Sequence, residues 1–129
     1  MSDRRHIPPL SPFEEEIGFT RALRVGERIV VAGTVGVAPD GTIPADAGAQ
    51  ADLCFAEILR HIETLGGSAA DVVRVRMFVT DIKDADAVSA AFSRALKATR
   101  PTGTLVAIAA LYRPEWKVEI EAEAIVSGG

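Results

Sequence analysis

The alternation of apolar and polar positions is clearest near the C-terminus. In the segment KVEIEAEAIV, residues 117–126, apolar side chains alternate with Glu119, Glu121 and Glu123. A period of two predicts a strand with one apolar face and one acidic face. Carboxylates two residues apart in a strand lie about 7 Å from one another and repel unless positive or polar groups face them. We therefore expect cations, a partner subunit or a polar cavity opposite this face.

Two helices are predicted where apolar residues recur every three or four positions. The first lies in the segment 45–67, where the apolar positions 51, 54, 58, 62 and 65 share one face, and it ends at Gly66-Gly67, a pair typical of helix C-termini. The second begins after Asp84 as N-cap and runs through about Lys97.

The remaining structured segments predict strands. Residues 17–35 indicate a hairpin around a Gly26-Glu27 turn, and residues 73–79 alternate valine and methionine against Arg74, Arg76 and Phe78. The segment from residue 100 predicts a strand joined to the acidic strand by a Pro-Glu-Trp corner. The order β-β-α-β-α-β-β predicts an α+β fold whose helices cover one sheet face. On the open face, Arg74 and Arg76 are expected to form ion pairs with the glutamates, buried between subunits.

Length and composition predict one folded domain. The chain has 129 residues, of which 48% are hydrophobic and 25% are charged. Residues 1–16, rich in proline, are expected to form an extended lead-in, and residues 17–129 the domain.

Charge and hydropathy exclude several classes of partner. The net charge of −4 provides no basic field for nucleic acid, and no apolar run reaches the roughly 20 residues that span a bilayer. With the single Cys54 and no recognisable leader, we expect a reducing cytoplasm. Cys54 falls on the apolar side of the first helix, which favours a buried thiol, and His61 is expected to face solvent. We predict no metal site.

Three strings carry a resemblance to a known family. They are VRVRMFVTDIKD at residues 73–84, RPTGT at 100–104 and VEIEAEA at 118–124. With the sequence around them, from residue 17 to 126, the chain resembles the Rid family, the YjgF-like reactive intermediate deaminases. The resemblance implies a ferredoxin-like or chorismate-mutase-like subunit, a homotrimer, and a small-molecule ligand in clefts between subunits. Characterised Rid deaminases hydrolyse enamines and imines such as 2-aminoacrylate to a 2-keto acid and ammonia, without metal or cofactor.

The resemblance also implies where the site lies and how it departs from the deaminase subgroup. The position of the subgroup's carboxylate-binding arginine is occupied by Gly103, and only the acidic position, Glu119, matches. The other site positions hold less polar residues than the subgroup has: Phe19 for tyrosine, Ala32 for serine, Ser89 for asparagine and Leu105 for cysteine. Loss of a guanidinium with two charge-assisted hydrogen bonds lowers affinity for a carboxylate by about a hundredfold or more. A replacement arginine could be Arg21, Arg24, Arg76 or Arg100.

Several candidate residues keep two interpretations. Glu119 could orient water or transfer a proton to an imine nitrogen, or pair with an arginine across an interface. Gly103 and Thr104 could bind a ligand oxygen through backbone amides and the hydroxyl, or simply begin a strand. Trp116 could form a wall of the cleft or pack at the corner.

Two functions follow from the sequence. The first is an imine or enamine hydrolase acting on a substrate other than 2-aminoacrylate, with Glu119 handling the proton. The alternative is a non-catalytic metabolite-binding module on the same trimeric scaffold. Cleavage of single-stranded RNA is disfavoured by the acidic charge balance and the lack of a basic aromatic groove.

Overall fold

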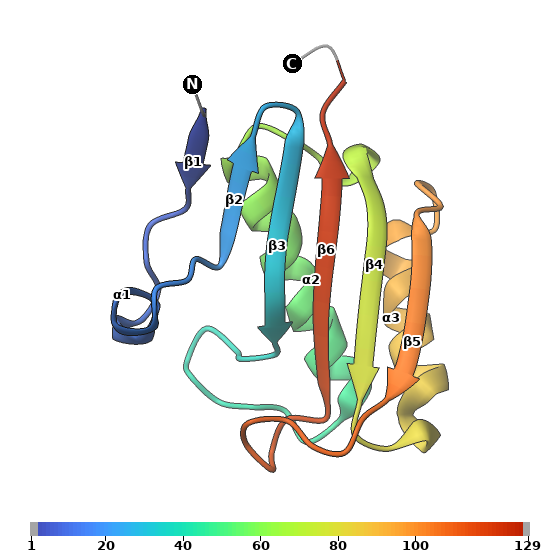
Figure 1. Cartoon of the computed structure of the whole chain (residues 1–129). Helices are drawn as coiled ribbons and strands as arrows, with labels where there is room; N and C mark the ends of the chain where they lie inside the picture. The colour runs from blue at the N-terminus through green and yellow to red at the C-terminus, as the bar shows by residue number, and fades with distance from the viewer. Residues whose placement is uncertain (1–2, 128–129) are drawn as a thin grey trace.

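A six-stranded sheet forms one layer of the molecule, and two long helices form the other (Figure 1). The structure is a computed structural model that describes residues 3–127. Its strands are β1 (Arg4–His6), β2 (Ala22–Val25), β3 (Arg28–Val35), β4 (Val72–Val79), β5 (Thr102–Ala107) and β6 (Val118–Ile125). Its α-helices are α1 (Pro12–Ile17), α2 (Ala47–Thr64) and α3 (Ala85–Leu96), with short 3₁₀ turns at Ala69–Asp71 and Ile82–Asp84.

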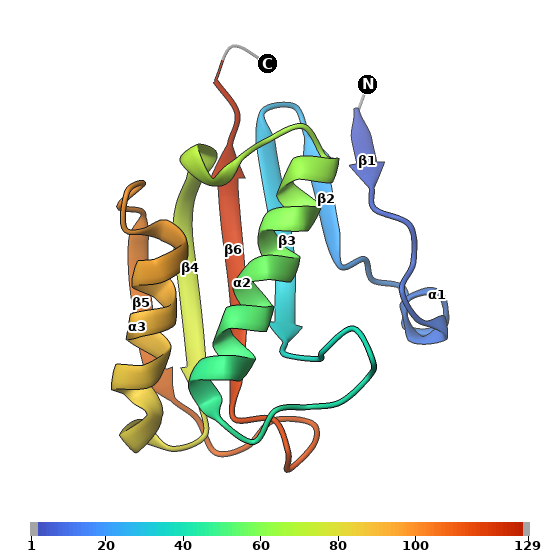
Figure 2. The same cartoon turned by 180° about the vertical axis from the view of Figure 1, so that it is seen from behind.

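The sheet order is β1-β2-β3-β6-β4-β5, and only the β4–β5 pair is parallel among the described strands. Both α2 and α3 lie on one face, as the view from behind shows (Figure 2). The predicted α+β architecture is confirmed. The two C-terminal strands are not neighbours, because β4 lies between β5 and β6.

The N-terminal segment differs from the expected extended lead-in. Residues 4–6 pair with β2 as an edge strand, and residues 12–17 form α1. Pro12 does not prevent this helix, because it occupies the first turn, where a backbone N–H has no helical partner. Glu14 Oε2 accepts hydrogen bonds from the N–H groups of Leu10 and Ser11, each at 2.8 Å, and so fixes the helix start.

The predicted hairpin and both predicted helices are present. Gly26 has φ of 60°, which suits the first position of the two-residue turn between β2 and β3. Helix α2 lies within the predicted segment and begins where the Asp46 carboxylate accepts a hydrogen bond from Ala49 N–H at 2.9 Å. Asp84 is the N-cap residue of α3, although its side chain makes no capping hydrogen bond.

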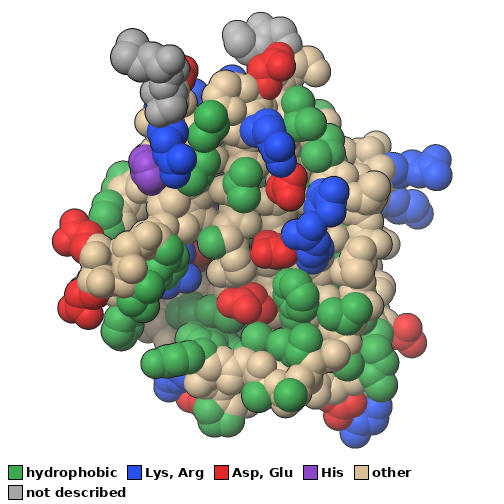
Figure 3. Space-filling view, viewed as in Figure 1, with side chains coloured by type: hydrophobic (Ala, Val, Ile, Leu, Met, Phe, Trp, Pro, Cys, Tyr) green, Lys and Arg blue, Asp and Glu red, His purple; other side chains and the backbone are tan. Residues whose placement is uncertain are grey.

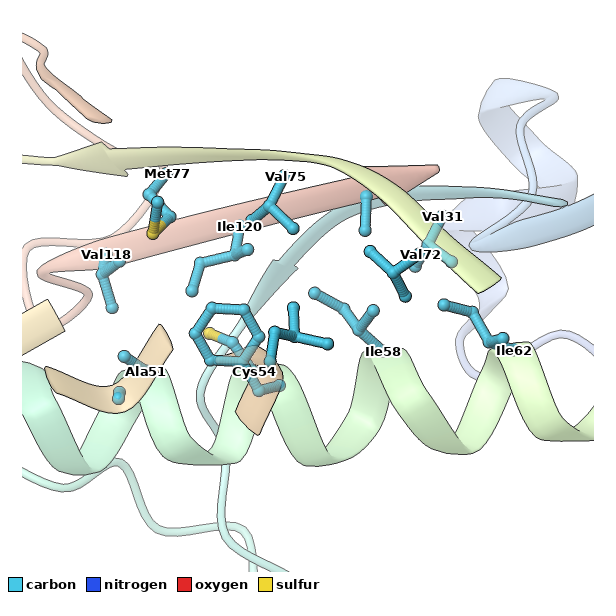
Figure 4. Packing of buried hydrophobic residues seen from close by; sticks show 14 of the residues in the cluster. Val31, Ala51, Cys54, Ile58, Ile62, Val72, Val75, Met77, Val118 and Ile120 are labelled. Carbon is cyan, nitrogen blue, oxygen red and sulfur yellow. The ribbon is translucent and has the colours of Figure 1, made fainter. Parts of the chain in front are cut away.

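The hydrophobic core fills the space between the sheet and these helices (Figure 4). Cys54 is fully buried there, as predicted, and its thiol donates to the Thr34 carbonyl at 3.2 Å. Burial raises the pKa of this thiol to about 12, so it stays protonated. Gln50 is also buried in the fold, and its amide joins the start of α2 to the segment before the helix and to the connection between β5 and β6. It donates to the carbonyls of Pro44 and Glu115 and accepts from Lys117 N–H, at 2.7, 2.9 and 2.9 Å.

Two sequence predictions about burial are wrong. His61 is only 7% exposed, because it follows Ile58 by three residues and lies on the flank of the apolar stripe. Its ring lies 3.4 Å from the Glu57 carboxylate. In β4, Val72 is buried and Val73 is exposed, since the pairing with β6 shifts register between Val72 and Arg74. Beyond this irregularity, Val75, Met77 and Val79 are buried as predicted.

The open face of the sheet carries alternating acidic and basic side chains (Figure 3). Arg76 donates to Glu121 at 2.9 Å, and Arg28 donates to Glu123 at 3.0 Å. The Arg74 Nε atom lies 4.0 Å from the same Glu123 carboxylate. The predicted pairing of arginines with the acidic strand is therefore confirmed, and these pairs form within one chain.

Candidate functional site

A hollow of about 630 Å³ opens on the helix-free face, toward the end of the sheet where the connection between β5 and β6 passes. Figure 3 shows a recess in the lower part of this face. Residues of three strands, of the segment before β2 and of the connection between β5 and β6 line the hollow. They are Phe19 and Arg21 before β2, Ala32 and Gly33 of β3, Phe78 of β4, Glu119 and Glu121 of β6, and Ile108, Ala110, Leu111 and Tyr112 of the connection. Apolar walls therefore surround a small number of charged groups.

Glu119 owes its position to an irregularity in β3. The β3–β6 register shifts between Val31 and Thr34, so Ala32 and Gly33 bulge out of regular pairing. A Cβ atom on Gly33 would lie only 2.8 Å from Glu119 Cδ. The glycine therefore lets the Glu119 carboxylate lie directly over the bulge.

The Glu119 carboxylate is half-buried and accepts no hydrogen bond from any residue in the range 3–127. Desolvation raises its pKa above the usual range for glutamate, and the nearby Glu121 charge raises it further, against the opposing effect of Arg21. A carboxylate with unused acceptor capacity and a raised pKa is a stronger base than an ordinary glutamate and can accept and return a proton.

Arg21 lies beside Glu119 in this hollow. Its guanidinium carbon is 5.3 Å from the centroid of the Phe19 ring, and its Nε is 3.7 Å from Glu14 Oε2. It is the one among the arginines considered from the sequence that lines the hollow.

The other arginines have different surroundings. Arg24 donates to the carbonyls of Gly26 and Leu65, and Arg76 is paired with Glu121. Arg100 follows α3 with a left-handed backbone, φ 54°. The arginine whose charge acts on Glu119 therefore comes from the segment just before β2.

The remaining predicted site residues lie toward the β5 edge. Gly103 stands opposite Val75 of β4, and a Cβ atom there would meet the Phe92 ring of α3 at 3.5 Å. Leu105 packs on the core, whereas Thr104 stands opposite Arg76 and is exposed. Ser89 is exposed on α3. None of these residues lines the hollow.

Trp116 also lies outside the hollow. It is in the connection between β5 and β6, where the Arg113 guanidinium carbon lies 5.6 Å from its ring centroid. Its Nε1 atom is buried and has no hydrogen-bond partner among the described residues.

The predicted site residues therefore form two groups within one chain. Phe19, Ala32 and Glu119 share the hollow, and the β5 group, consisting of Ser89, Gly103, Thr104 and Leu105, lies across β4 from it. The sequence did not lead us to select Gly33 or Phe78 as site residues. Phe78 could have been found from its alternation with Arg74 and Arg76, whereas the role of Gly33 depends on the bulge.

Nothing in residues 3–127 brings together three histidine, cysteine, aspartate or glutamate side chains in a way that could hold a metal ion. Over the same range, every helix is too short or too polar to cross a bilayer.

The chain is similar to known proteins along most of its length. A family model described as Endoribonuclease L-PSP matches residues 11–126. The 2-iminobutanoate/2-iminopropanoate deaminase of Escherichia coli K12 is 32% identical over 111 residues, covering 83% of this chain and 86% of that protein.

Solved structures agree with the sequence match. Rv2704 from Mycobacterium tuberculosis, a member of the YjgF/YER057c/UK114 family, has a TM-score of 0.87 at 36% identity, covering 96% of this chain and all of that chain. Escherichia coli TdcF with bound serine has a TM-score of 0.79 at 28% identity, covering 95% of this chain and 94% of that chain. The chain therefore belongs to the Rid family, the YjgF-like proteins.

Proposed function

We propose that this protein hydrolyses an imine or enamine other than 2-aminoacrylate, without a cofactor, and that Glu119 transfers the proton. The observation that carries the proposal is the half-buried Glu119 carboxylate, which lies over Gly33 in an open hollow with no hydrogen-bond donor among the described residues. The deaminase name of the Escherichia coli relative supports the same reaction class.

The chemistry needs one group that accepts and returns a proton. Water adds to the carbon of the C=N bond, and Glu119 accepts the proton that this water loses. The protonated carboxyl delivers this proton to nitrogen, which gives a carbinolamine. The Glu119 carboxylate then accepts the hydroxyl proton and passes it to nitrogen as the C–N bond breaks, the C=O bond forms and ammonia leaves. An enamine first takes up a proton at carbon and loses one from nitrogen to become the imine. Desolvation raises the pKa of Glu119 above its usual range and so makes this carboxylate a stronger base for accepting the proton of water.

The substrate should differ from that of the deaminase subgroup because Gly103 provides no guanidinium. The hollow is also lined largely by apolar side chains, including Phe19, Phe78 and Leu111. A substrate with more apolar surface than 2-aminoacrylate fits such walls better.

We further propose a homotrimer in which the β5 group of one subunit faces the hollow of its neighbour. The observation that supports this is the separation of the two groups by β4 within one chain. Strand β5 is also an edge strand that pairs only with β4 and is mostly exposed. Sedimentation should give the mass of a trimer, and a monomer at assay concentration would contradict the assembly.

Subunit mixing tests the composite site directly. Glu119→Gln should inactivate the hollow, and Gly103→Trp should obstruct the β5 group. If each cleft combines two subunits, mixed trimers of the two inactive variants contain some clefts with both groups intact and regain activity. Failure of mixed trimers to regain activity, with exchange confirmed by mass spectrometry, would rule out a shared cleft.

The reaction is tested with imines generated in place by an amino-acid oxidase, while ammonia and carbonyl product are measured. Wild type should accelerate hydrolysis, and Glu119→Gln should lose the acceleration. Glu123→Gln is the matched control because Glu123 pairs with Arg28 outside the hollow. Equal turnover by wild type and Glu119→Gln would refute the assigned role.

The alternative function is a metabolite-binding module, which the absence of an arginine at Gly103 favours. In that case ligands should raise the melting temperature of wild type and Glu119→Gln alike, and no substrate should turn over. Turnover that depends on Glu119 excludes this alternative.

A further inference from the structure

Arg21 is held in the hollow without using its hydrogen-bonding capacity. The Phe19 ring lies beside its guanidinium, and the contact with Glu14, at 3.7 Å, is longer than a hydrogen bond. Glu14 Oε2 is already occupied by the N–H groups of Leu10 and Ser11. Arg21 donates no hydrogen bond to any residue in the described part of the chain. Its fork of N–H donors is therefore available to a ligand.

The walls around Arg21 are apolar and partly aromatic. Phe19 is 38% exposed and Tyr112 is 95% exposed, although both are large rings that gain from burial. Phe78, Ile108 and Leu111 complete this apolar lining. A ligand that covers these side chains needs an apolar body, and one that satisfies Arg21 needs an anionic oxygen pair.

We infer that the hollow binds a carboxylic acid with an aryl or bulky alkyl group, whose carboxylate is held by Arg21 and whose apolar body lies on Phe19, Phe78 and Tyr112. This inference deepens the proposed function, on which it rests, because it names the ligand class of the same hollow. It assigns the carboxylate to the hairpin side of the site, away from Gly103.

The position of Arg21 next to Glu119 has a consequence for binding. A bound carboxylate adds another negative charge close to Glu119, and Arg21 already faces Glu14 in an ion pair at 3.7 Å and acts on Glu57 as well. Glu119→Gln removes one of these charges and should bind the carboxylate more tightly. This effect has the opposite sign to the expected loss of turnover in the same variant.

Calorimetric titration of the full-length protein with stable ligands tests the inference. The probes are 3-phenylpropanoate, its uncharged isostere 3-phenylpropanamide, and acetate. Wild type should bind 3-phenylpropanoate about tenfold or more tightly than the amide, which corresponds to about 1.4 kcal/mol. Acetate should bind more weakly than 3-phenylpropanoate because it lacks the apolar body.

Variants at Arg21 separate its role from general electrostatics. Arg21→Gln should weaken 3-phenylpropanoate binding about tenfold or more, and Arg21→Lys should fall between that variant and wild type. Arg28→Gln is the matched control because Arg28 lies on the same face and pairs with Glu123 outside the hollow. It should leave binding unchanged.

Equal affinity of wild type for the acid and the amide would overturn the inference, as would absence of binding to both. Unchanged binding by a folded Arg21→Gln variant would also overturn it. The comparison of acid with amide needs only wild type, so it decides the question even if Arg21→Gln fails to fold. If Glu119→Gln keeps full turnover while Arg21→Gln loses ligand, the proposed reaction fails and the ligand class stands.

Discussion

Glu119 and Glu123 lie on the same face of the same strand, yet their surroundings differ. Glu123 stands opposite Arg74 in the register with β4, and its carboxylate accepts a hydrogen bond from Arg28 at 3.0 Å. Glu119 stands opposite Phe78 and accepts no hydrogen bond from the described residues. Whether the neighbouring strands bring an arginine within reach thus decides whether a carboxylate is paired or remains available for chemistry.

The largest expected effect is on turnover. Glu119→Gln should lower kcat/KM by about 100- to 10,000-fold, because it removes the group that transfers the proton. Glu123→Gln, measured in the same ammonia-release assay, should stay close to wild type. Equal losses in the two variants would mean that the two carboxylates do not differ in function.

The next effect comes from the glycine beneath Glu119. Gly33→Val should lower kcat/KM by about 100-fold, because the new side chain would displace the carboxylate from its position over the bulge. Val30→Ile, which enlarges a side chain of the same strand outside the hollow, is the control. A Gly33→Val protein that folds and keeps wild-type activity would show that this close approach is not needed.

A third prediction places an arginine opposite Glu119, as Arg76 already lies opposite Glu121. In Phe78→Arg, a guanidinium would face Glu119, so the pKa of this carboxyl should fall toward or below its usual range. Carboxyl chemical shifts measured by NMR through an acid titration would follow this change. Phe78→Gln, which is polar but uncharged, should shift the pKa less, and an unchanged pKa in Phe78→Arg would contradict the cause assigned to the raised value.

The smallest expected effect is on stability: Glu119→Gln and Glu123→Gln should change the free energy of unfolding in opposite directions. The folded-state pKa of Glu119 is raised, so the folded protein binds the proton more tightly and stability falls as pH rises through that pKa. At pH 7, Glu119→Gln should therefore raise the free energy of unfolding, by less than about 1 kcal/mol because the group is half-exposed. Glu123→Gln should lower it by about 0.2 to 1 kcal/mol through loss of the Arg28 pair. Urea unfolding at pH 7 measures both, and changes of the same sign would contradict the comparison.

The sequence predicted those features that depend on local periodicity. The acidic strand, both long helices, the hairpin turn and the charged open face all follow from spacings within single segments. Val73 in β4 was predicted incorrectly to lie on the apolar face because a register shift changes the alternation at the strand start, where Val72 is buried instead. Strand register depends on the neighbouring strand, which local spacing does not contain.

The sequence indicated which residues could belong to the candidate site, but not how those residues lie relative to one another in the fold. The family resemblance selected Glu119 and Gly103 together, although β4 separates their strands in one chain. It could not choose among the arginines, since the position of Arg21 beside Glu119 depends on how the hairpin packs next to β6. The close approach of Gly33 depends on a bulge, and no turn-type residue pattern marks it.

The buried Gln50 amide has an evolutionary consequence. It fastens residues 115 and 117, at the base of the connection between β5 and β6, to the start of α2. The part of the connection that borders the hollow, residues 108–112, ends in the exposed Tyr112 and lies beyond these bonds. Mutations at that tip can change which molecules fit while the anchored base preserves folding. The protein thus has a short segment in which new substrate preferences can arise without loss of the scaffold.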